Sequence, residues 1–174
     1  MKDIQAYIHG IDSRLDSMEI APDEIVFEER VKLACFNCMR YGVNHTCPPR
    51  IPQVDYRKAI CEYEHALLVW CIMKYNPDTM EEVRRESTLL LHRALLQAEK
   101  YFWDRDNSLA TSFIGGSCKL CAQGCAKDAC RQPRLARIPV EATGINVIET
   151  CRKKGMKISF PTNGQMYRIG LLLW

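Results

Sequence analysis

Ten cysteines are the residues of this sequence whose type and spacing point most directly to chemistry. The tightest set lies in GGSCKLCAQGCAKDACRQP, follows C-x2-C-x3-C-x4-C and comprises Cys118, Cys121, Cys125 and Cys130. Thiolates two or three residues apart can converge on one ion or cluster from a single loop, whereas such close neighbours make poor disulfide partners. We therefore interpret this set as a metal centre rather than as part of a disulfide framework.

A donor set made only of thiolates leaves two kinds of metal open. Soft thiolates wrapped around a small volume suit a [4Fe-4S] cluster. Gly115, Gly116 and Gly124 would let backbone amides turn toward the sulfur atoms. Zinc also binds four thiolates, at tetrahedral geometry. We predict a [4Fe-4S] cluster at this set, with zinc as the alternative.

A second set lies far upstream, in CFNCMRYGVNHTCPP, and follows C-x2-C-x8-C with Cys35, Cys38 and Cys47. Three thiolates are enough to hold a cluster in which one iron takes another ligand. This set could therefore bind a second cluster, and an open iron there could bind substrate or sulfur. Candidates for the missing ligand are an external molecule or one of three side chains, His45, Cys61 and Cys151.

A competing arrangement would place two cysteine pairs on a single zinc ion. The pairs are Cys35 with Cys38 and Cys118 with Cys121. The stretch between the pairs is far longer than the usual separation in zinc ribbons. The sequence therefore favours separate centres over this shared site.

The other cysteines have plainer interpretations. Cys71 lies inside a predicted apolar strand and Cys61 is expected to begin one, so we expect both to be buried small apolar side chains. Cys151 shares the inward stripe of a predicted helix with Ile148, and we expect it to be buried too.

The charge of the chain is mild, with a net charge of +3 and a pI near 8.3, and Lys and Arg are interspersed among Asp and Glu. This distribution does not indicate nucleic-acid binding. Basic residues around the four-cysteine set either offset the charge of a thiolate cluster, guide an acidic redox partner, or form an ordinary solvated surface: Lys119, Lys127, Arg131, Arg134 and Arg137.

Nothing in the sequence resembles a secretory signal, and no apolar run is long enough to span a bilayer. We therefore expect a cytoplasmic protein that does not contact a membrane. In a reducing cytosol, free metal-binding thiols are favoured over disulfides. No Gly-rich phosphate loop, nucleophile motif or paired acid–base carboxylates indicate an enzyme class.

The elements that must position the first cysteine set can be predicted from apolar periodicity. Residues 1–15 have the spacing of an amphipathic helix. Residues 24–38 alternate with period two, which predicts extended structure that delivers the first cysteines. Residues 38–55 are rich in Pro and Gly and should form an irregular loop, and the continuous apolar run 65–75 predicts a central strand buried on both faces.

The second half of the chain predicts the elements around the other set. A long helix spans 78–106, with Thr79 and Glu82 in capping-box positions, and the short strand 108–116 ends at the cysteine loop. Strand, helix and strand together indicate a crossover unit. A second helix over 141–155 follows, and then two strands, 156–160 and 165–174, joined by a turn.

These elements predict a single α+β domain over residues 1–174. Its one sheet should be mixed or antiparallel and covered by helices, with the cysteines in metal-binding loops. A chain of 174 residues is long enough to bury a real core, so crosslinks are not needed merely for folding.

At the level of whole motifs, the sequence resembles DUF2284, a family of predicted metal-binding proteins found largely in anaerobic bacteria and archaea. The resemblance runs from about Val31 to the closing YRIGLLL. Its motifs are C-x2-C with Tyr41 and Gly42 before Cys-Pro-Pro, the four-cysteine loop, and Glu-Ala-x-Gly-Ile before a helix. It implies metal or iron–sulfur binding by both cysteine sets, and it implies no particular reaction.

Three functions follow as hypotheses. The first is an iron–sulfur protein with one or two [4Fe-4S] clusters that serves electron transfer or redox support in anaerobic metabolism. The second is an enzyme that uses the open iron of a cluster at Cys35, Cys38 and Cys47. The third is a zinc-stabilised binding or scaffold protein.

Overall fold

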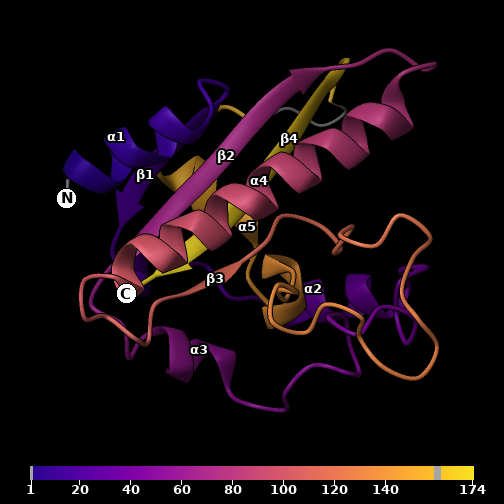
Figure 1. Cartoon of the computed structure of the whole chain (residues 1–174), viewed down its shortest axis with the longest axis horizontal. Helices are drawn as coiled ribbons and strands as arrows, with labels where there is room; N and C mark the ends of the chain where they lie inside the picture. Colours follow the sequence, from indigo (N-terminus) through magenta and orange to yellow (C-terminus); the bar gives the residue numbers. More distant parts are fainter. Residues whose placement is uncertain (1, 159–161) are drawn as a thin grey trace.

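An antiparallel sheet of four strands in the order β1-β2-β4-β3 forms the centre of the computed structural model, which describes residues 2–158 and 162–174 (Figure 1). All three neighbouring pairs are antiparallel. The strands, in spatial order, are β1 (Leu15–Ile20), β2 (Ala66–Lys74), β4 (Gln165–Leu173) and β3 (Thr111–Phe113). The α-helices are α1 (Lys2–Ile11), α2 (Glu29–Phe36), α3 (Tyr56–Ile60), α4 (Met80–Trp103) and α5 (Val147–Lys153), and two short 3-10 helices are η1 (Pro22–Glu24) and η2 (Val140–Thr143).

The sheet is buried on both faces. On one face, Leu67 and Val69 of β2 pack with Leu91 and Leu95 of α4, and α1 extends the same core. On the other face, Leu68 joins residues of α3, α5 and η2. Alternate residues of β2 therefore point into two different apolar cores, which explains why the strand reads as a continuous apolar run. The predicted α+β class, with helices covering an antiparallel sheet, is confirmed.

The strands β2 and β3 run in the same direction, because each is antiparallel to β4, which lies between them. The long helix α4 connects them across one face of the sheet (Figure 1). This is a crossover unit that has been split by a strand from later in the chain. The crossover was predicted from the sequence, and its inserted strand was not.

The segment 24–38 corrects one prediction, since most of it is helical rather than extended. Glu24 ends η1, Phe27 bridges to Ile145, and α2 then begins at Glu29. No side chain of α2 is buried, so the helix has no inward stripe that a periodicity search could find. The structure therefore delivers Cys35 from the last turn of a helix.

The end of the chain also differs from the prediction. The helix expected over 141–155 is divided at Gly144, whose φ of 90° ends η2, and α5 begins after Asn146, whose side chain accepts from Glu149 N–H. Residues 156–158 are not in a strand, and residues 159–161 lie outside the described residues. The strand β4 pairs with β2 and β3, and its pairing with β2 continues to a hydrogen bond from Tyr75 N–H to Gly164 O at 2.8 Å.

The start of α4 differs in a smaller detail. Thr79 precedes the helix as predicted, but its side chain makes no capping hydrogen bond to the helix backbone. Its hydroxyl instead lies 3.0 Å from both Asn76 N–H and the Asn76 side-chain oxygen. The predicted capping box with Glu82 is therefore wrong, although the helix itself is confirmed.

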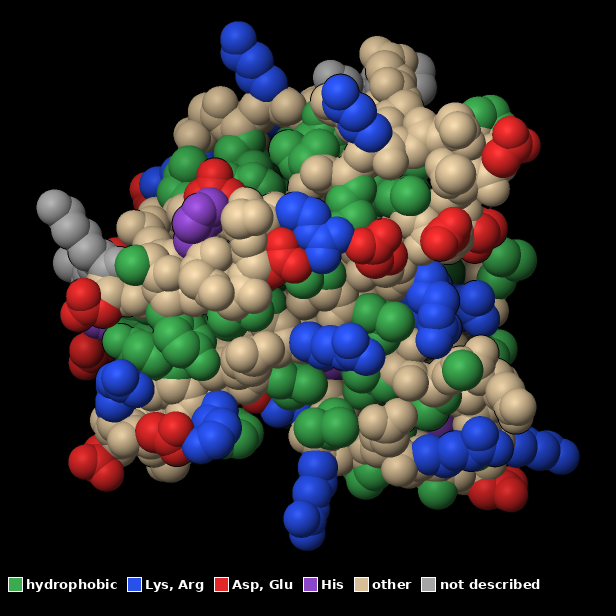
Figure 2. All heavy atoms as spheres, turned by 45° about the horizontal axis from the view of Figure 1, so that its top comes forward, with side chains coloured by type: hydrophobic (Ala, Val, Ile, Leu, Met, Phe, Trp, Pro, Cys, Tyr) green, Lys and Arg blue, Asp and Glu red, His purple; other side chains and the backbone are tan. Residues whose placement is uncertain are grey.

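The surface carries charges of both signs. On the face shown in Figure 2, Lys and Arg side chains are distributed among Asp and Glu side chains, with apolar side chains between them. Within residues 2–158 and 162–174, none of the helices combines the length and the apolar character needed to cross a bilayer.

Candidate metal centre

The four-cysteine set lies in a long loop over residues 114–140, called the excursion below, whose two ends are hydrogen-bonded to each other. Ile114 N–H donates to Ile138 O at 3.0 Å, and Val140 N–H donates to Ile114 O at 2.8 Å. Gly115 lies against the sheet so closely that a methyl group there would be 2.5 Å from Ile169 O. The loop is therefore fixed to β4 at its base, while Gly116 and Gly124 turn it with φ values of 73° and 77°.

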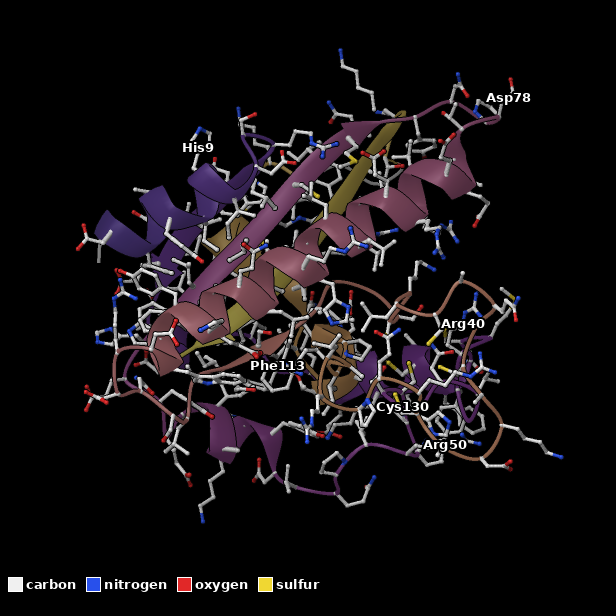
Figure 3. The ribbon with its side chains drawn as sticks, viewed as in Figure 1. His9, Arg40, Arg50, Asp78, Phe113 and Cys130 are labelled. Carbon is white, nitrogen blue, oxygen red and sulfur yellow. The ribbon has the colours of Figure 1, made fainter. Side chains whose placement is uncertain are left out.

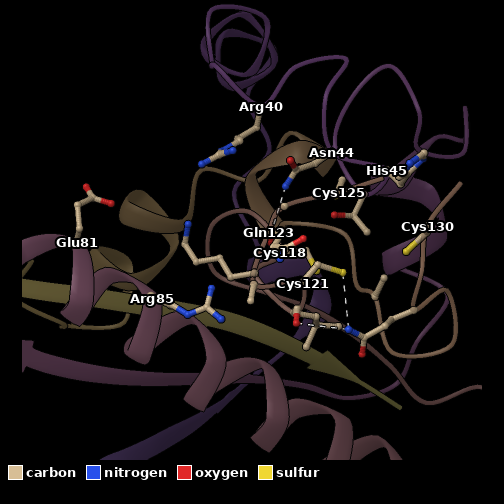
Figure 4. Close-up of a pocket in the computed structure, with 17 residues that line it drawn as sticks. Arg40, Asn44, His45, Glu81, Arg85, Cys118, Cys121, Gln123, Cys125 and Cys130 are labelled. Atoms are coloured by element: carbon tan, nitrogen blue, oxygen red, sulfur yellow. Dashed lines mark hydrogen bonds between the residues drawn. The ribbon is translucent and has the colours of Figure 1, made fainter. Parts of the chain in front are cut away.

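All four cysteines of this loop line one cavity of about 490 Å³ (Figure 4). Cys118, Cys121, Cys125 and Cys130 are each partly buried. Three basic side chains, Arg40, Arg85 and Lys119, line the same cavity. Positive groups at this position would offset the negative charge of a thiolate-bound centre.

The first set lines a different cavity, of about 280 Å³. Cys35 comes from α2, Cys38 follows the helix, and Cys47 lies in a loop closed by a hydrogen bond from Gly42 N–H to Pro48 O at 2.8 Å. Pro48 and two alanines contribute to the wall, so the three thiols face a largely apolar space. The irregular loop predicted over residues 38–55 is confirmed, and the short helix α3 follows it directly.

The two cysteine loops pack against each other. His45 Nε2–H donates to Ala126 O at 2.8 Å. The Asn44 side-chain amide donates to Cys118 O at 3.3 Å (Figure 4). Figure 3 shows the same arrangement from further away, with sulfur atoms gathered near Arg40, Arg50 and Cys130. Segments separated by some 80 positions in the chain thus form one cysteine-rich region, which Figure 1 places beside α2.

The spacing of these thiols bears on the kind of metal group that they could hold. All ten cysteines are free thiols. Among the described residues, no three Cys, His, Asp or Glu side chains are gathered closely enough to bind a single metal ion. A tetrahedral zinc site would need sulfur atoms about 3.8 Å apart, because each Zn–S bond is about 2.3 Å long. Thiolates bind both zinc and iron–sulfur clusters.

Burial raises the pKa of several of these thiols. The pKa of Cys47 is raised to about 12, first by burial and then by its neighbours Cys38 and Cys35. Burial also raises the pKa of Cys35 and Cys118. These thiols are therefore protonated at neutral pH in the metal-free protein, and a metal cation must displace their protons on binding.

Two other side chains of the region were not identified from the sequence. The Gln132 side-chain amide lies 3.7 Å from Cys121 Sγ and 3.4 Å from Leu120 O, so it can donate to the thiol. Glu141 lines the cavity of the first cysteine set, called the first cavity below, together with the three thiols of that set. The only sequence signal was their position, Gln132 two residues after the last cysteine of its set and Glu141 in the Glu-Ala motif.

The family comparison bears directly on these motifs. A family model described as "Predicted metal-binding protein (DUF2284)" matches residues 18–174. The chain belongs to the DUF2284 family. No curated protein and no solved structure matches it. Metal binding is thus what the family description predicts for this DUF2284 protein, and the two cysteine-lined cavities are where the structure offers thiols for it.

The remaining cysteines of this DUF2284 protein are mostly where they were expected. Cys71 and Cys151 are fully buried in the two apolar cores, as predicted. Cys61 is exposed just after α3, so its predicted burial is wrong. The strand begins only at Ala66, which leaves Cys61 outside the core.

The basic residues around the second set divide into two groups. Lys119 lines the cavity, whereas Lys127, Arg131 and Arg134 are exposed to solvent. Arg137 is held by an ion pair with Glu99, a fully buried residue of α4, so its charge is already balanced. Ser112 Oγ–H donates to the same carboxylate at 2.6 Å.

The helix α4 of this DUF2284 protein also holds the end of the excursion through His92. The His92 side chain is fully buried, its Nε2–H donates to Leu135 O at 2.8 Å, and its Nδ1 has no partner in the part of the chain that the structure describes. Burial lowers the pKa of His92; nearby Arg137 lowers it further, while the bond to Leu135 and Glu99 oppose the shift. The imidazole is therefore neutral in the folded protein at pH 7.

We expect the stability of the protein to fall as the pH falls below about 6.5, the ordinary pKa of histidine. In that range the unfolded chain binds a proton at His92 that the folded protein does not, and the unfolded state is favoured by up to about 1.4 kcal/mol per pH unit. Urea unfolding should show that the free energy of unfolding falls more between pH 7.5 and pH 5.5 for the wild type than for His92→Gln. The glutamine amide still donates a hydrogen bond but does not titrate. Equal losses in the two proteins would contradict this assignment.

Proposed function

We propose that this protein binds iron–sulfur clusters, with a [4Fe-4S] cluster at Cys118, Cys121, Cys125 and Cys130 and a second cluster at Cys35, Cys38 and Cys47, and that it serves electron transfer. The observation that carries the proposal is that seven cysteines from two distant segments line two cavities in loops that pack together. A bound cluster would take up one electron from a donor protein and release it to an acceptor.

The chain's own residues support this role in three ways. The four cysteines of the second set line one cavity and the three of the first set line another, as the ligands of two separate clusters would. The Gln132 amide can donate to Cys121 Sγ, and donors to ligand sulfur raise the reduction potential of such centres. Arg40 lines both cavities, where its positive charge can stabilise a reduced centre in either one.

Exposed basic residues near the second set favour an acidic redox partner. Lys127, Arg131 and Arg134 are exposed on the loop that carries the four cysteines. A complementary acidic surface on a partner protein would speed encounter in a manner that weakens with salt.

The test is anaerobic purification followed by iron, acid-labile sulfide and zinc analysis, with EPR before and after reduction. The proposal predicts brown protein with equal amounts of iron and sulfide, and an EPR signal that appears on one-electron reduction and disappears on reoxidation. Colourless protein that holds stoichiometric zinc would contradict it and would support the zinc-stabilised scaffold.

A second function, catalysis at the first set, is favoured by one observation. The cavity of about 280 Å³ beside Cys35, Cys38 and Cys47 has mainly apolar walls and space next to the thiols. A small molecule could reach an iron there that lacks a fourth cysteine. Binding of a small thiol or sulfide that changes the spectrum of one cluster only would favour this function over simple electron transfer.

A further inference from the structure

We propose that Glu141 is the fourth protein ligand of the metal centre at Cys35, Cys38 and Cys47. This inference rests on the proposed function, because it assumes that a metal group occupies the first cavity. It assigns to that centre a carboxylate from η2, an element far from the three cysteines in the sequence.

The candidates considered from the sequence lie elsewhere. His45 lines the other cavity; its Nε2–H bonds to Ala126 O, and its Nδ1 lies 3.2 Å from the Arg50 guanidinium, so both nitrogens are engaged. Cys61 is exposed at the end of α3, and Cys151 is fully buried in the core that α5 covers. Neither cysteine lines the first cavity.

The geometry of the cavity gives Glu141 its place. The three thiols come from α2 and the loop after it. Two other segments of the chain also line the cavity, through Gly116, Ser117, Pro139, Glu141 and Ala142. A cubane cluster presents its four iron atoms toward four corners, so three cysteines leave one iron for a ligand from another part of the lining. Besides the three cysteines, Glu141 is the only Cys, His, Asp or Glu among the described residues that line this cavity.

The carboxylate of Glu141 is also free to bind a metal. Its only hydrogen bond to another residue in the described part of the chain is from Gly116 N–H to Oε2, at 3.4 Å. It lines the same cavity as Cys35. Burial raises the pKa of Glu141, and nearby Arg168 opposes this shift only in part. Carboxylate oxygens bind iron, and a metal cation would stabilise the charged form that burial disfavours.

The contacts of η2 explain why the carboxylate is held in this position. Glu28 N–H, just before α2, donates to Gly144 O at 2.9 Å, which ties the end of η2 to the helix that carries Cys35. Val140 N–H donates to Ile114 O at the base of the second cysteine loop. Glu141 therefore lies on a short segment fixed to both cysteine loops.

The experiment compares Glu141→Gln with wild type, both prepared anaerobically with ⁵⁷Fe, and uses Glu149→Gln as the control. Glu149 lies in the first turn of α5 and lines neither cysteine cavity. The readouts are iron per chain, Mössbauer spectra and EPR of the oxidised protein. We expect Glu141→Gln to lose about one iron per chain and to show the EPR signal of a three-iron cluster, while the second centre keeps its spectrum.

Three other results would each decide whether Glu141 is a ligand. Iron content and spectra equal to wild type would overturn it. Loss of both centres together would also overturn it, because Glu141 would then support the fold of both loops rather than bind one metal. If wild type holds zinc rather than iron, the proposed function fails; loss of one zinc ion in Glu141→Gln, but not in Glu149→Gln, would still support Glu141 as a ligand.

Discussion

Replacing Cys125 with serine is expected to remove one metal centre and to leave the other in place. Cys125 lines the larger cavity, and Cys38 lines the smaller one. Serine offers a hard oxygen donor where a soft thiolate is needed, so each variant should lose the centre to which its cysteine belongs. For [4Fe-4S] clusters, Cys125→Ser and Cys38→Ser should each lose about four iron atoms per chain and retain the rest.

The control for this pair is Cys61→Ser, because Cys61 is an exposed cysteine that lines neither cavity. It should keep the full iron content and both EPR signals. Loss of all metal in both Cys125→Ser and Cys38→Ser would contradict two separate centres. It would instead favour one shared site, such as a zinc ion bound by cysteines from both sets.

The second large effect is expected from the buried ion pair that anchors the excursion to α4. Glu99 is fully buried, and its carboxylate accepts from Arg137 Nε–H at 2.7 Å and from Ser112 Oγ–H at 2.6 Å. Glu99→Ala leaves the Arg137 guanidinium largely buried without a counter-charge. Removing one partner of a buried pair costs about 3–5 kcal/mol, and we expect a loss of that size in the free energy of unfolding.

Anaerobic denaturant unfolding measures this loss, and α4 also provides the control. Glu82 is exposed on the first turn of the same helix, so Glu82→Ala should change the stability by less than about 0.5 kcal/mol. The double variant Glu99→Leu/Arg137→Met removes both charges and should recover part of the loss. Equal unfolding midpoints for Glu99→Ala and Glu82→Ala would show that the pair does not stabilise the fold.

The sequence predicts best those features that depend on local spacing or on long patterns. The cysteine sets could be identified because their ligands lie within single loops. The strand β2 and the helix α4 could be predicted because one is a long apolar run and the other keeps a helical stripe over 24 residues. The cysteine spacing alone is compatible with an iron–sulfur cluster or with zinc. The family resemblance separately indicated metal binding.

The features that were missed depend on contacts between distant segments. The helix α2 buries no side chain, so its sequence carries no amphipathic signal. The strand predicted over 156–160 would form a hairpin with β4, but β4 pairs with β2 and β3. Glu141 and Gln132 meet the thiols only after the excursion closes at Ile114, which no local pattern reveals.

The position of β4 between β2 and β3 has a consequence for how the protein is made. During synthesis on a ribosome, β1 and β2 can pair early, but β3 has no neighbour until β4 emerges. Both cysteine loops leave the ribosome before that strand, so their thiols are exposed on a chain whose sheet is incomplete. Cluster delivery that waits for β4 would meet a preformed pair of cavities, whereas earlier delivery would have to act on unfinished loops.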